Sequence, residues 1–166
     1  MSKVFIICGR TGAGKTTLAK KLASEMGAFR FSHDEIFRTL YGKTIDDFEA
    51  ACEGVNRLIL RQVSELLNLK VPIILEGWGG RKRRDELRGQ LSLLGANYQF
   101  IYVECPAEVR MERVLNRNPN IGLEGFHIDQ ETFYRIEEVN EEFDSDEPCI
   151  VVDNSKNNEF PLIKLD

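Results

Sequence analysis

The stretch KVFIICGRTGAGKTTLAKKLASEMG, residues 3–27, constrains the fold more than any other part of the chain. An apolar run from Val4 to Ile7 predicts a short buried strand, and the amphipathic segment after Gly14 predicts a helix. The loop between them has the spacing Gly-x-x-x-x-Gly-Lys-Thr. A strand that leads through such a loop directly into a helix is the Walker A arrangement, which indicates a phosphate-binding loop, or P-loop.

The residue types of this loop suit a polyphosphate. Glycines let the backbone turn sharply and approach the ligand, so that successive N–H groups point inward. Lys15 is expected to reach the β- and γ-phosphates, and the Thr16 hydroxyl is expected to be a ligand of Mg²⁺. The sequence therefore predicts ATP and Mg²⁺ as cofactors. The loop residues expected to contact the nucleotide are Gly9, Arg10, Thr11, Gly12, Ala13, Gly14, Lys15, Thr16 and Thr17.

Short apolar runs alternate with amphipathic segments along the rest of the chain, which predicts an α/β fold of three layers. A five-stranded parallel sheet would carry helices on both faces. Strands are expected at 3–8, 29–32, 71–75, 98–103 and 149–152. Helices are expected at about 14–26, after Ser32, at about 46–69, 82–95 and 106–117, and after Asp129, the last carrying Phe133, Ile136, Asn140 and Phe143 on one face. Ligands of such sheets bind beyond the carboxyl ends of the strands.

Length and composition agree with one domain over residues 1–166. The sequence has no apolar run long enough for a membrane span, and its start lacks the pattern of a signal peptide, so we expect a cytoplasmic protein with no membrane partner. None of the four cysteines forms a C-x-x-C pair, and three of them lie in apolar runs. This favours buried reduced thiols over a disulfide or a zinc site.

Polar residues follow the second and third expected strands. In FSHDEIFRTLYG, Asp34 and Arg38 lie four residues apart on one helical face, as a base and an acceptor-binding group would, although a helix start also favours an acid. In ILEGWGG, Glu76 ends the strand and is expected to hold the water shell of Mg²⁺ or to orient the acceptor. Trp78 is expected either to wall the acceptor pocket or to cover the edge of the core.

The fourth strand is followed by ECPAEVRMERVLNRN, which places Arg110, Arg113 and Arg117 on one helical face. Such a stripe of like charge attracts an anion. The segment at about 118–128 has no periodicity and predicts a loop. An arginine helix with a loop beside the phosphate site suits a lid that excludes water. A solvated basic face is the alternative.

These segments together resemble the small P-loop kinases related to nucleoside monophosphate kinases. The resemblance is to an "AAA-like" group that includes the polynucleotide 5'-hydroxyl kinase domain, chloramphenicol phosphotransferase, gluconate kinase and zeta-toxin-like enzymes. It implies that Asp34 activates the acceptor hydroxyl and that Arg38 positions the acceptor. It further implies that Arg113 and Arg117 form an R-x-x-x-R pair on the adenine and the donor phosphates, and that Asp153 lines the adenine side.

The chain departs from this family at Glu76 and Trp78, where many relatives have Asp-Gly-Thr or Asp-Thr-Asn. The expected catalytic residues are Lys15, Asp34 and Arg117, and the expected acceptor-binding residues are Asp34, Arg38, Glu76 and Trp78. Lys15 and Thr16 would act on the phosphates and on Mg²⁺, which Glu76 would hold through water.

The distribution of charge along the chain bears on the kind of acceptor that the protein would bind. The net charge is −5; residues 81–117 carry eight basic and five acidic residues, whereas residues 118–166 carry three basic and thirteen acidic residues. The run RKRR at 81–84 would suit a phosphorylated or nucleic-acid acceptor, but a solvated helix start explains it as well. Without a broad basic groove, a small-molecule or nucleoside-like hydroxyl is favoured over an oligonucleotide. The expected function is an ATP-dependent kinase; polynucleotide 5'-hydroxyl kinase and non-catalytic ATP-binding module are the alternatives.

Overall fold

Strands and helices alternate along the chain in the order that the sequence predicts. The strands are β1 (Lys3–Gly9), β2 (Phe29–Ser32), β3 (Ile73–Glu76), β4 (Asn97–Glu104) and β5 (Cys149–Asp153). The helices are α1 (Lys15–Met26), α2 (His33–Tyr41), α3 (Phe48–Asn68), α4 (Arg81–Leu93), α5 (Ala107–Arg117) and α6 (Gln130–Glu138), with the short 3-10 helix η1 (Asn118–Asn120) after α5. Within the described residues, no helix is both long and apolar enough to cross a membrane.

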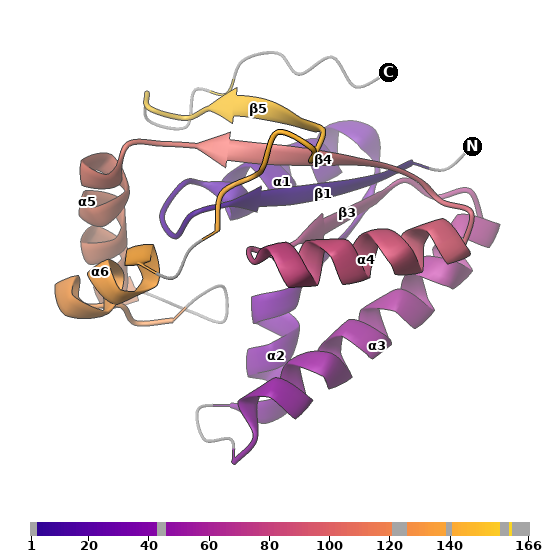
Figure 1. Ribbon diagram of the computed structural model, residues 1–166, viewed down its shortest axis with the longest axis horizontal. Coiled ribbons are helices and arrows are strands. Elements are labelled where there is room, and N and C mark those ends of the chain that lie inside the picture. The colour runs from indigo at the N-terminus through magenta and orange to yellow at the C-terminus, as the bar shows by residue number, and fades with distance from the viewer. Residues whose placement is uncertain (1–2, 43–45, 121–125, 139–140, 157–159, 161–166) are drawn as a thin grey trace.

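In the computed structural model of the protein, the described residues are 3–42, 46–120, 126–138, 141–156 and 160. The five strands form one sheet in the order β2-β3-β1-β4-β5, and every neighbouring pair is parallel. Figure 1 shows α3 and α4 in front of this sheet and α1 behind it. The predicted α/β fold with a five-stranded parallel sheet is confirmed.

The central strand β1 contributes to two hydrophobic cores. Val4, Ile6 and Cys8 pack towards α2, α3 and α4. Phe5 and Ile7 pack towards α1. Because successive side chains of a strand point to opposite faces, this single buried strand joins both helix layers. It also places the loop after Gly9 at the centre of the sheet edge where ligands of such folds bind.

Side-chain caps set the starts of three helices. At α3, Asp47 Oδ1 accepts a hydrogen bond from the backbone N–H of Ala50 at 3.0 Å. The Ser32 hydroxyl accepts a hydrogen bond from the backbone N–H of Glu35 at 3.4 Å, and Asp129 Oδ1 accepts one from the N–H of Thr132 at 2.8 Å. The Glu35 carboxylate binds Arg30 rather than returning to the cap. Glu35 stands three residues after Ser32, as in a capping box, but only the Ser32 half of that arrangement is formed.

The prediction for the last helix is wrong at its C-terminal end. Helix α6 ends at Glu138, Asn140 lies outside the described residues, and Phe143 lies beyond the helix. The Phe143 ring instead packs 5.7 Å from that of Phe100 and 5.3 Å from that of Tyr102, both on β4. The apolar spacing continued past the helix because the next segment covers the sheet.

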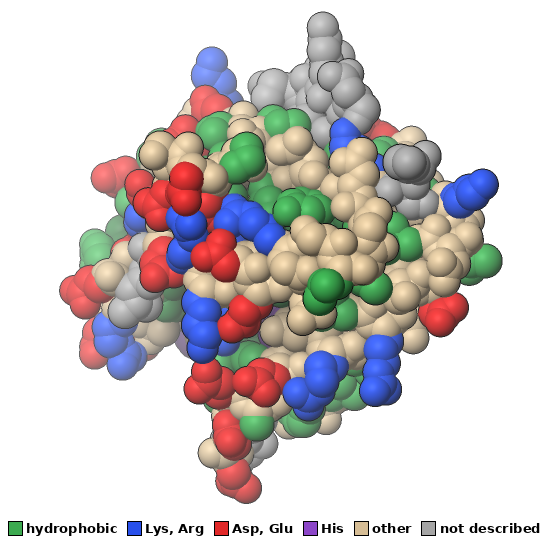
Figure 2. All heavy atoms as spheres, turned by 45° about the vertical axis from the view of Figure 1, so that its right-hand side comes forward, with side chains coloured by type: hydrophobic (Ala, Val, Ile, Leu, Met, Phe, Trp, Pro, Cys, Tyr) green, Lys and Arg blue, Asp and Glu red, His purple; other side chains and the backbone are tan. Residues whose placement is uncertain are grey.

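Basic and acidic side chains are interspersed on the surface. Figure 2 shows Lys and Arg next to Asp and Glu over the visible face, rather than one broad basic area. Many of these neighbours are ion pairs between the basic middle of the chain and its acidic C-terminal part. Examples are Arg81 with Asp144 at 2.8 Å and with Asp146 at 2.9 Å.

Candidate active site

The parallel register brings the polar residues at the strand ends together. Ile7 of β1 pairs with Glu76 of β3, and Ser32 of β2 pairs with the same Glu76. The P-loop therefore begins beside the end of β3, and α2 begins on the other side of it. As a result, Lys15, Asp34 and Glu76 line one cavity.

Two glycines hold the P-loop in a conformation that other residues rarely adopt. Gly9 has φ of +148°, and a Cβ there would lie 2.6 Å from the carbonyl oxygen of Val103. Gly12 has φ of +80°, and a Cβ there would lie 2.5 Å from the carbonyl oxygen of Arg110. Both contacts are too short for any side chain. The loop therefore packs tightly against β4 and α5.

Helix α1 begins with its N–H groups directed to the loop. Its N-cap is Gly14, which has no side chain to cap the helix. Lys15 Nζ donates to the carbonyl oxygen of Arg10 at 3.0 Å. Burial lowers the pKa of Lys15, while the carboxylates of Asp34 and Glu76 raise it. The first N–H groups of a helix and a lysine at one loop fit a phosphate group.

Thr16 and Glu76 form a pair of oxygen donors. The Thr16 hydroxyl donates to Glu76 Oε1. Glu76 Oε2 lies 3.0 Å from Arg30 Nη2, and Arg30 also binds Glu35. A hydroxyl and a carboxylate are hard ligands of the kind that Mg²⁺ prefers. This donor set therefore fits the predicted Mg²⁺, with Arg30 fixing the orientation of Glu76.

The first cavity, called here the P-loop cavity, has a volume of about 310 Å³. Arg117 reaches it from the end of α5. Its Nε is buried and has no hydrogen-bond partner among the described residues. Burial lowers the pKa of Arg117, and Asp34 opposes this shift. A buried guanidinium N–H without an acceptor suits the binding of an anionic group. The lining residues are Thr11, Gly12, Lys15, Thr16, Asp34, Glu76, Arg117, Phe126, His127, Ile128, Thr132 and Ile136.

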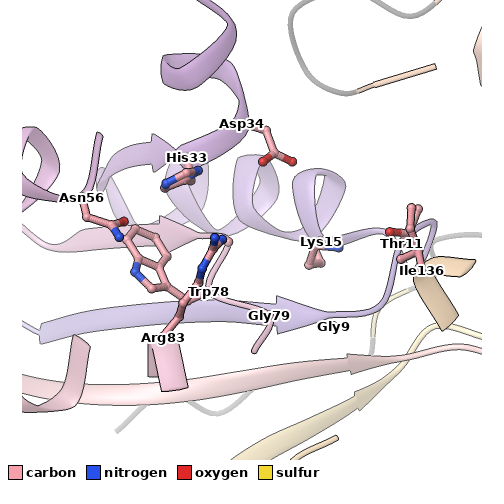
Figure 3. A pocket seen from close by; sticks show the side chains of 11 residues that line it. Gly9, Thr11, Lys15, His33, Asp34, Asn56, Trp78, Gly79, Arg83 and Ile136 are labelled. Carbon is pink, nitrogen blue, oxygen red and sulfur yellow. The ribbon is translucent and has the colours of Figure 1, made fainter. Parts of the chain in front are cut away.

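The second cavity, called here the tryptophan cavity, has a volume of about 180 Å³. Figure 3 shows it with Asp34 between Lys15 on one side and His33 and Trp78 on the other. Lys15 and Asp34 line both cavities, so the two spaces meet at these residues. The lining residues are Gly9, Thr11, Lys15, His33, Asp34, Asn56, Gly77, Trp78, Gly79, Arg83 and Ile136.

Asp34 and Arg38 have different surroundings, although they share a helical face. Asp34 is exposed in the first turn of α2 and lines both cavities. Arg38 lines neither cavity; its guanidinium lies 5.3 Å from the centre of the Phe126 ring. The position of Asp34 suits a base, whereas the role of Arg38 stays a prediction.

Trp78 covers the edge of the core and also lines a cavity, while its contact with the acceptor stays a prediction. It is 6% exposed, packs in the core below α3 and α4, and walls the tryptophan cavity. Its φ is +57°, which is rare for a bulky residue and stores about 1–3 kcal/mol of backbone strain. The Cys8 thiol donates to the carbonyl oxygens of Gly77 and Trp78 at 3.4 and 3.6 Å. Those contacts help to hold the strained turn.

The α5 arginines do not form the open basic stripe predicted from their spacing. Arg110 is 3% exposed and makes two hydrogen bonds to Glu137, at 2.7 and 2.6 Å. Arg113 donates to the carbonyl oxygen of Asn154 at 3.0 Å. Among the three arginines, Arg117 lines the P-loop cavity. The alternative of a solvated basic face is also wrong, because Arg110 is buried.

Arg10 extends from the P-loop away from both cavities. It donates to Glu137 at 2.8 Å and to Glu142 at 2.8 Å. The same Glu137 binds Arg110, and these hydrogen bonds lower the pKa of Glu137. Arg10 and Arg110 thus join the P-loop, α5 and α6 through one carboxylate. Thr17 is exposed on α1 and, like Arg10, does not line the two cavities.

The loop after β5 contacts the P-loop through a residue that the sequence reasoning missed. Asp153 is exposed and accepts from the N–H and the hydroxyl of Ser155, at 2.8 and 3.1 Å. Asn154 is buried, and its Nδ2 donates to the carbonyl oxygen of Ala13 at 2.6 Å. The sequence signal that could have identified Asn154 is its position one residue past the end of a strand.

The arginines of the basic run at 81–84 largely form ion pairs within the protein. Arg84 is fully buried and binds Glu147 at 2.6 Å, while Arg81 pairs with surface acids. The expected solvated helix start is therefore wrong for Arg84. Arg83 is exposed and lines the tryptophan cavity, as does Asn56 from the middle of α3. Sequence reasoning missed Asn56, because no motif marks it, and considered Arg83 only as part of the run at 81–84.

The predicted lid at 118–128 is described only in part. Residues 118–120 form η1, and residues 121–125 lie outside the described residues. The Asn118 side chain closes the base of this segment: its Nδ2 donates to the Ile128 carbonyl at 2.7 Å, and its Oδ1 accepts from the Ile128 N–H at 3.2 Å. A lid function for the segment stays a prediction.

Solved structures share this fold. A sugar kinase from Janibacter sp. HTCC2649 superposes with a TM-score of 0.65 and 23% identity, covering 92% of this chain and 86% of that one. A chain of the Pnkp1/Rnl/Hen1 RNA repair complex gives a TM-score of 0.67 and 20% identity, covering 81% of this chain and 42% of that one. At these identities the comparison concerns the fold alone.

Sequence comparison agrees with the resemblance to small P-loop kinases. Shikimate kinase from Francisella tularensis subsp. holarctica is 30% identical over 115 residues, which cover 68% of this chain and 63% of that enzyme. The match therefore spans less than two thirds of the length of the relative. The family model described as "AAA domain" matches residues 4–142, from β1 to beyond α6. The chain belongs to this AAA domain family.

Proposed function

We propose that the protein is an ATP-dependent kinase that transfers the γ-phosphoryl group to a hydroxyl of a small molecule. The observation that carries this proposal is that the P-loop cavity and the tryptophan cavity meet at Lys15 and Asp34. ATP would bind in the first cavity and the acceptor in the second. A pure nucleotide-binding module needs no second cavity with a carboxylate at the junction.

The residues at this junction suit phosphoryl transfer. Asp34 accepts the proton of the acceptor hydroxyl, whose oxygen bonds to the γ-phosphorus as the bond to ADP breaks. Lys15 and Arg117 neutralise charge on the transferred group. Thr16 and Glu76 would hold Mg²⁺, which would supply further charge neutralisation. Arg113 and Asp153 are proposed to lie on the adenine side.

The size and charge of the acceptor side favour a small molecule over a polynucleotide. The tryptophan cavity, at about 180 Å³, is smaller than the roughly 300–1,000 Å³ typical of sites for drug-sized ligands, which suits a compact acceptor. Arg84 and Arg81 of the basic run are neutralised by carboxylates, and basic and acidic groups are mixed on the face in Figure 2. Polynucleotide 5'-hydroxyl kinase remains the second candidate, supported by the fold of the RNA repair chain.

A screen of hydroxyl compounds with γ-labelled ATP tests the proposal. The panel contains sugars, hydroxy acids, nucleosides and 5'-hydroxyl oligonucleotides, and the readout is labelled product rather than ATP consumption. We expect transfer to a low-molecular-weight acceptor. Transfer to oligonucleotides alone would favour the second candidate, and tight ATP binding without any labelled product would favour the non-catalytic module.

A further inference from the structure

Arg83 differs from its neighbours on α4. Arg81, Arg84 and Arg88 each pair with at least one carboxylate. Arg83 has no carboxylate within 4.0 Å in the part of the chain that the structure describes. It lies instead beside the thiol of Cys52, whose pKa burial raises and the Arg83 charge lowers. A neutral thiol leaves the guanidinium charge uncompensated, and this charge lies on the wall of the tryptophan cavity.

Asn56 supplies a second unsatisfied group on the same wall. Its Oδ1 is buried and has no hydrogen-bond partner among residues 3–42, 46–120, 126–138, 141–156 and 160. Buried polar atoms are nearly always paired in native proteins, so this oxygen calls for a donor. A hydroxyl of a bound molecule is such a donor.

These groups lie at the end of the cavity away from the P-loop. Figure 3 shows Asn56, Trp78, His33 and Arg83 together, with Asp34 between them and Lys15. Burial lowers the pKa of His33, so the imidazole is neutral at pH 7. Arg83 is therefore the cation at this end. A molecule whose reacting hydroxyl lies at Asp34 would place its remaining groups here.

We propose that the acceptor is a compact hydroxylated acid, whose anionic group binds Arg83 and whose second hydroxyl donates to Asn56. The inference rests on the proposed function, because Asp34 is taken to receive the reacting hydroxyl. Charges on the cavity wall agree with it. Among the described lining residues, Asp34 is the one carboxylate, against the two cations Lys15 and Arg83. An anionic acceptor that enters the cavity therefore meets lining residues with an excess of positive charge.

Another cavity adjoins the Arg83 end of the tryptophan cavity, and its carboxylates do not neutralise the charge of Arg83. Asn56, Trp78 and Arg83 also line a space of about 270 Å³ between α3 and α4. Its acids are Glu53 and Glu86, both exposed, and neither lies within 4.0 Å of Arg83. Solvent screens exposed carboxylates, so they compete weakly with a ligand that binds Arg83 directly.

Calorimetric binding to matched pairs tests the acid subsite without requiring turnover. Each pair consists of a short sugar acid or cyclic hydroxy acid and the neutral alcohol with the same carbon skeleton, added to the full chain with Mg²⁺ and a non-hydrolysable ATP analogue. We expect at least one acid to bind about 10-fold or more tightly than its alcohol, because a charge-assisted hydrogen bond is strong. If no acid binds better than its alcohol, the subsite is refuted.

Substitutions separate the two contacts. Arg83→Met should remove the preference for the acid while leaving alcohol and ATP binding unchanged, and Arg83→Lys should restore part of it. Asn56→Ala should weaken acid and alcohol alike. Lys82→Met, a control at a side chain that is 81% exposed, should change none of these affinities. Retention of the acid preference in Arg83→Met would overturn the proposal. If an acid binds as predicted but no phosphorylated product forms, the subsite stands and the kinase function is refuted.

Discussion

Helices α4 and α5 are both basic, and the arginines of each divide in the same way. One arginine of each helix is locked into the fold by a carboxylate of the acidic C-terminal part: Arg84 by Glu147 and Arg110 by Glu137, each at 2.6 Å. Another arginine of each helix lines a cavity and has no carboxylate within 4.0 Å among the described residues. These two are Arg83 and Arg117.

This division explains the uneven charge of the chain. The excess of acids after residue 118 neutralises a large share of the basic residues at 81–117, and two of the remaining cations, Arg83 and Arg117, line the two cavities. Paired arginines should therefore matter for stability, because breaking a buried pair leaves an isolated charge. Unpaired ones should matter for binding and turnover. The following substitutions test that distinction.

Lys15→Ala should have the largest effect on activity, because Lys15 is the cation at the junction of the two cavities. We expect transfer to fall by about 10³-fold or more, with weaker ATP binding and little change in thermal stability. Labelled-product assays measure the rate of transfer, and nucleotide titration measures the affinity for ATP. Lys82→Ala removes the same charge from the surface and serves as the control. Wild-type turnover in Lys15→Ala would contradict the assignment of the P-loop cavity to ATP.

Glu147→Gln should chiefly destabilise the fold, by about 3–5 kcal/mol, because it leaves Arg84 buried without a countercharge. Hydrogen bonds from Arg84 lower the pKa of Glu147 from 4.5 to about 2. The carboxylate therefore stabilises the protein fully above pH 4.5, and this contribution is lost as the pH falls towards 2. Denaturant unfolding at several pH values should show this loss in the wild type and a flatter profile in Glu147→Gln.

Glu112→Gln is the matched control, since Glu112 is exposed on α5. It should retain both the stability and the pH profile of the wild type. Equal destabilisation by the two substitutions would mean that net charge, rather than the buried pair, sets the stability.

Arg117→Ala should have a smaller effect, confined to function. We expect kcat to fall by about 10²-fold with a minor change in ATP affinity, because Arg117 meets charge that grows during transfer. Arg113→Ala, on the same helix, should mainly raise the KM for ATP. Steady-state kinetics separates the two results. Similar small changes in both variants, or loss of stability in Arg117→Ala, would contradict a role for Arg117 in phosphoryl transfer.

The sequence predicts the donor side better than the acceptor side for a physical reason. Nucleotide contacts of the P-loop lie in one continuous segment whose glycines and lysine are required by backbone geometry and charge. The tryptophan cavity is lined by residues of the P-loop, α2, α3, the loop after β3, α4 and α6. Asn56 on α3 and Arg83 on α4 therefore meet only after folding. Helix periodicity places Arg110 and Arg117 on one face but cannot show that Glu137 neutralises the first of them.

Asp34→Asn is the decisive substitution, because Asp34 lies where the two cavities meet. Asn has nearly the same size but cannot accept the acceptor proton, so transfer to the true acceptor should fall by about 10²- to 10⁴-fold. ATP affinity and thermal stability should stay close to wild type, and slow hydrolysis of ATP by water should fall much less. Transfer to the identified acceptor at the wild-type rate in Asp34→Asn would contradict the account and make Glu76 the next candidate base.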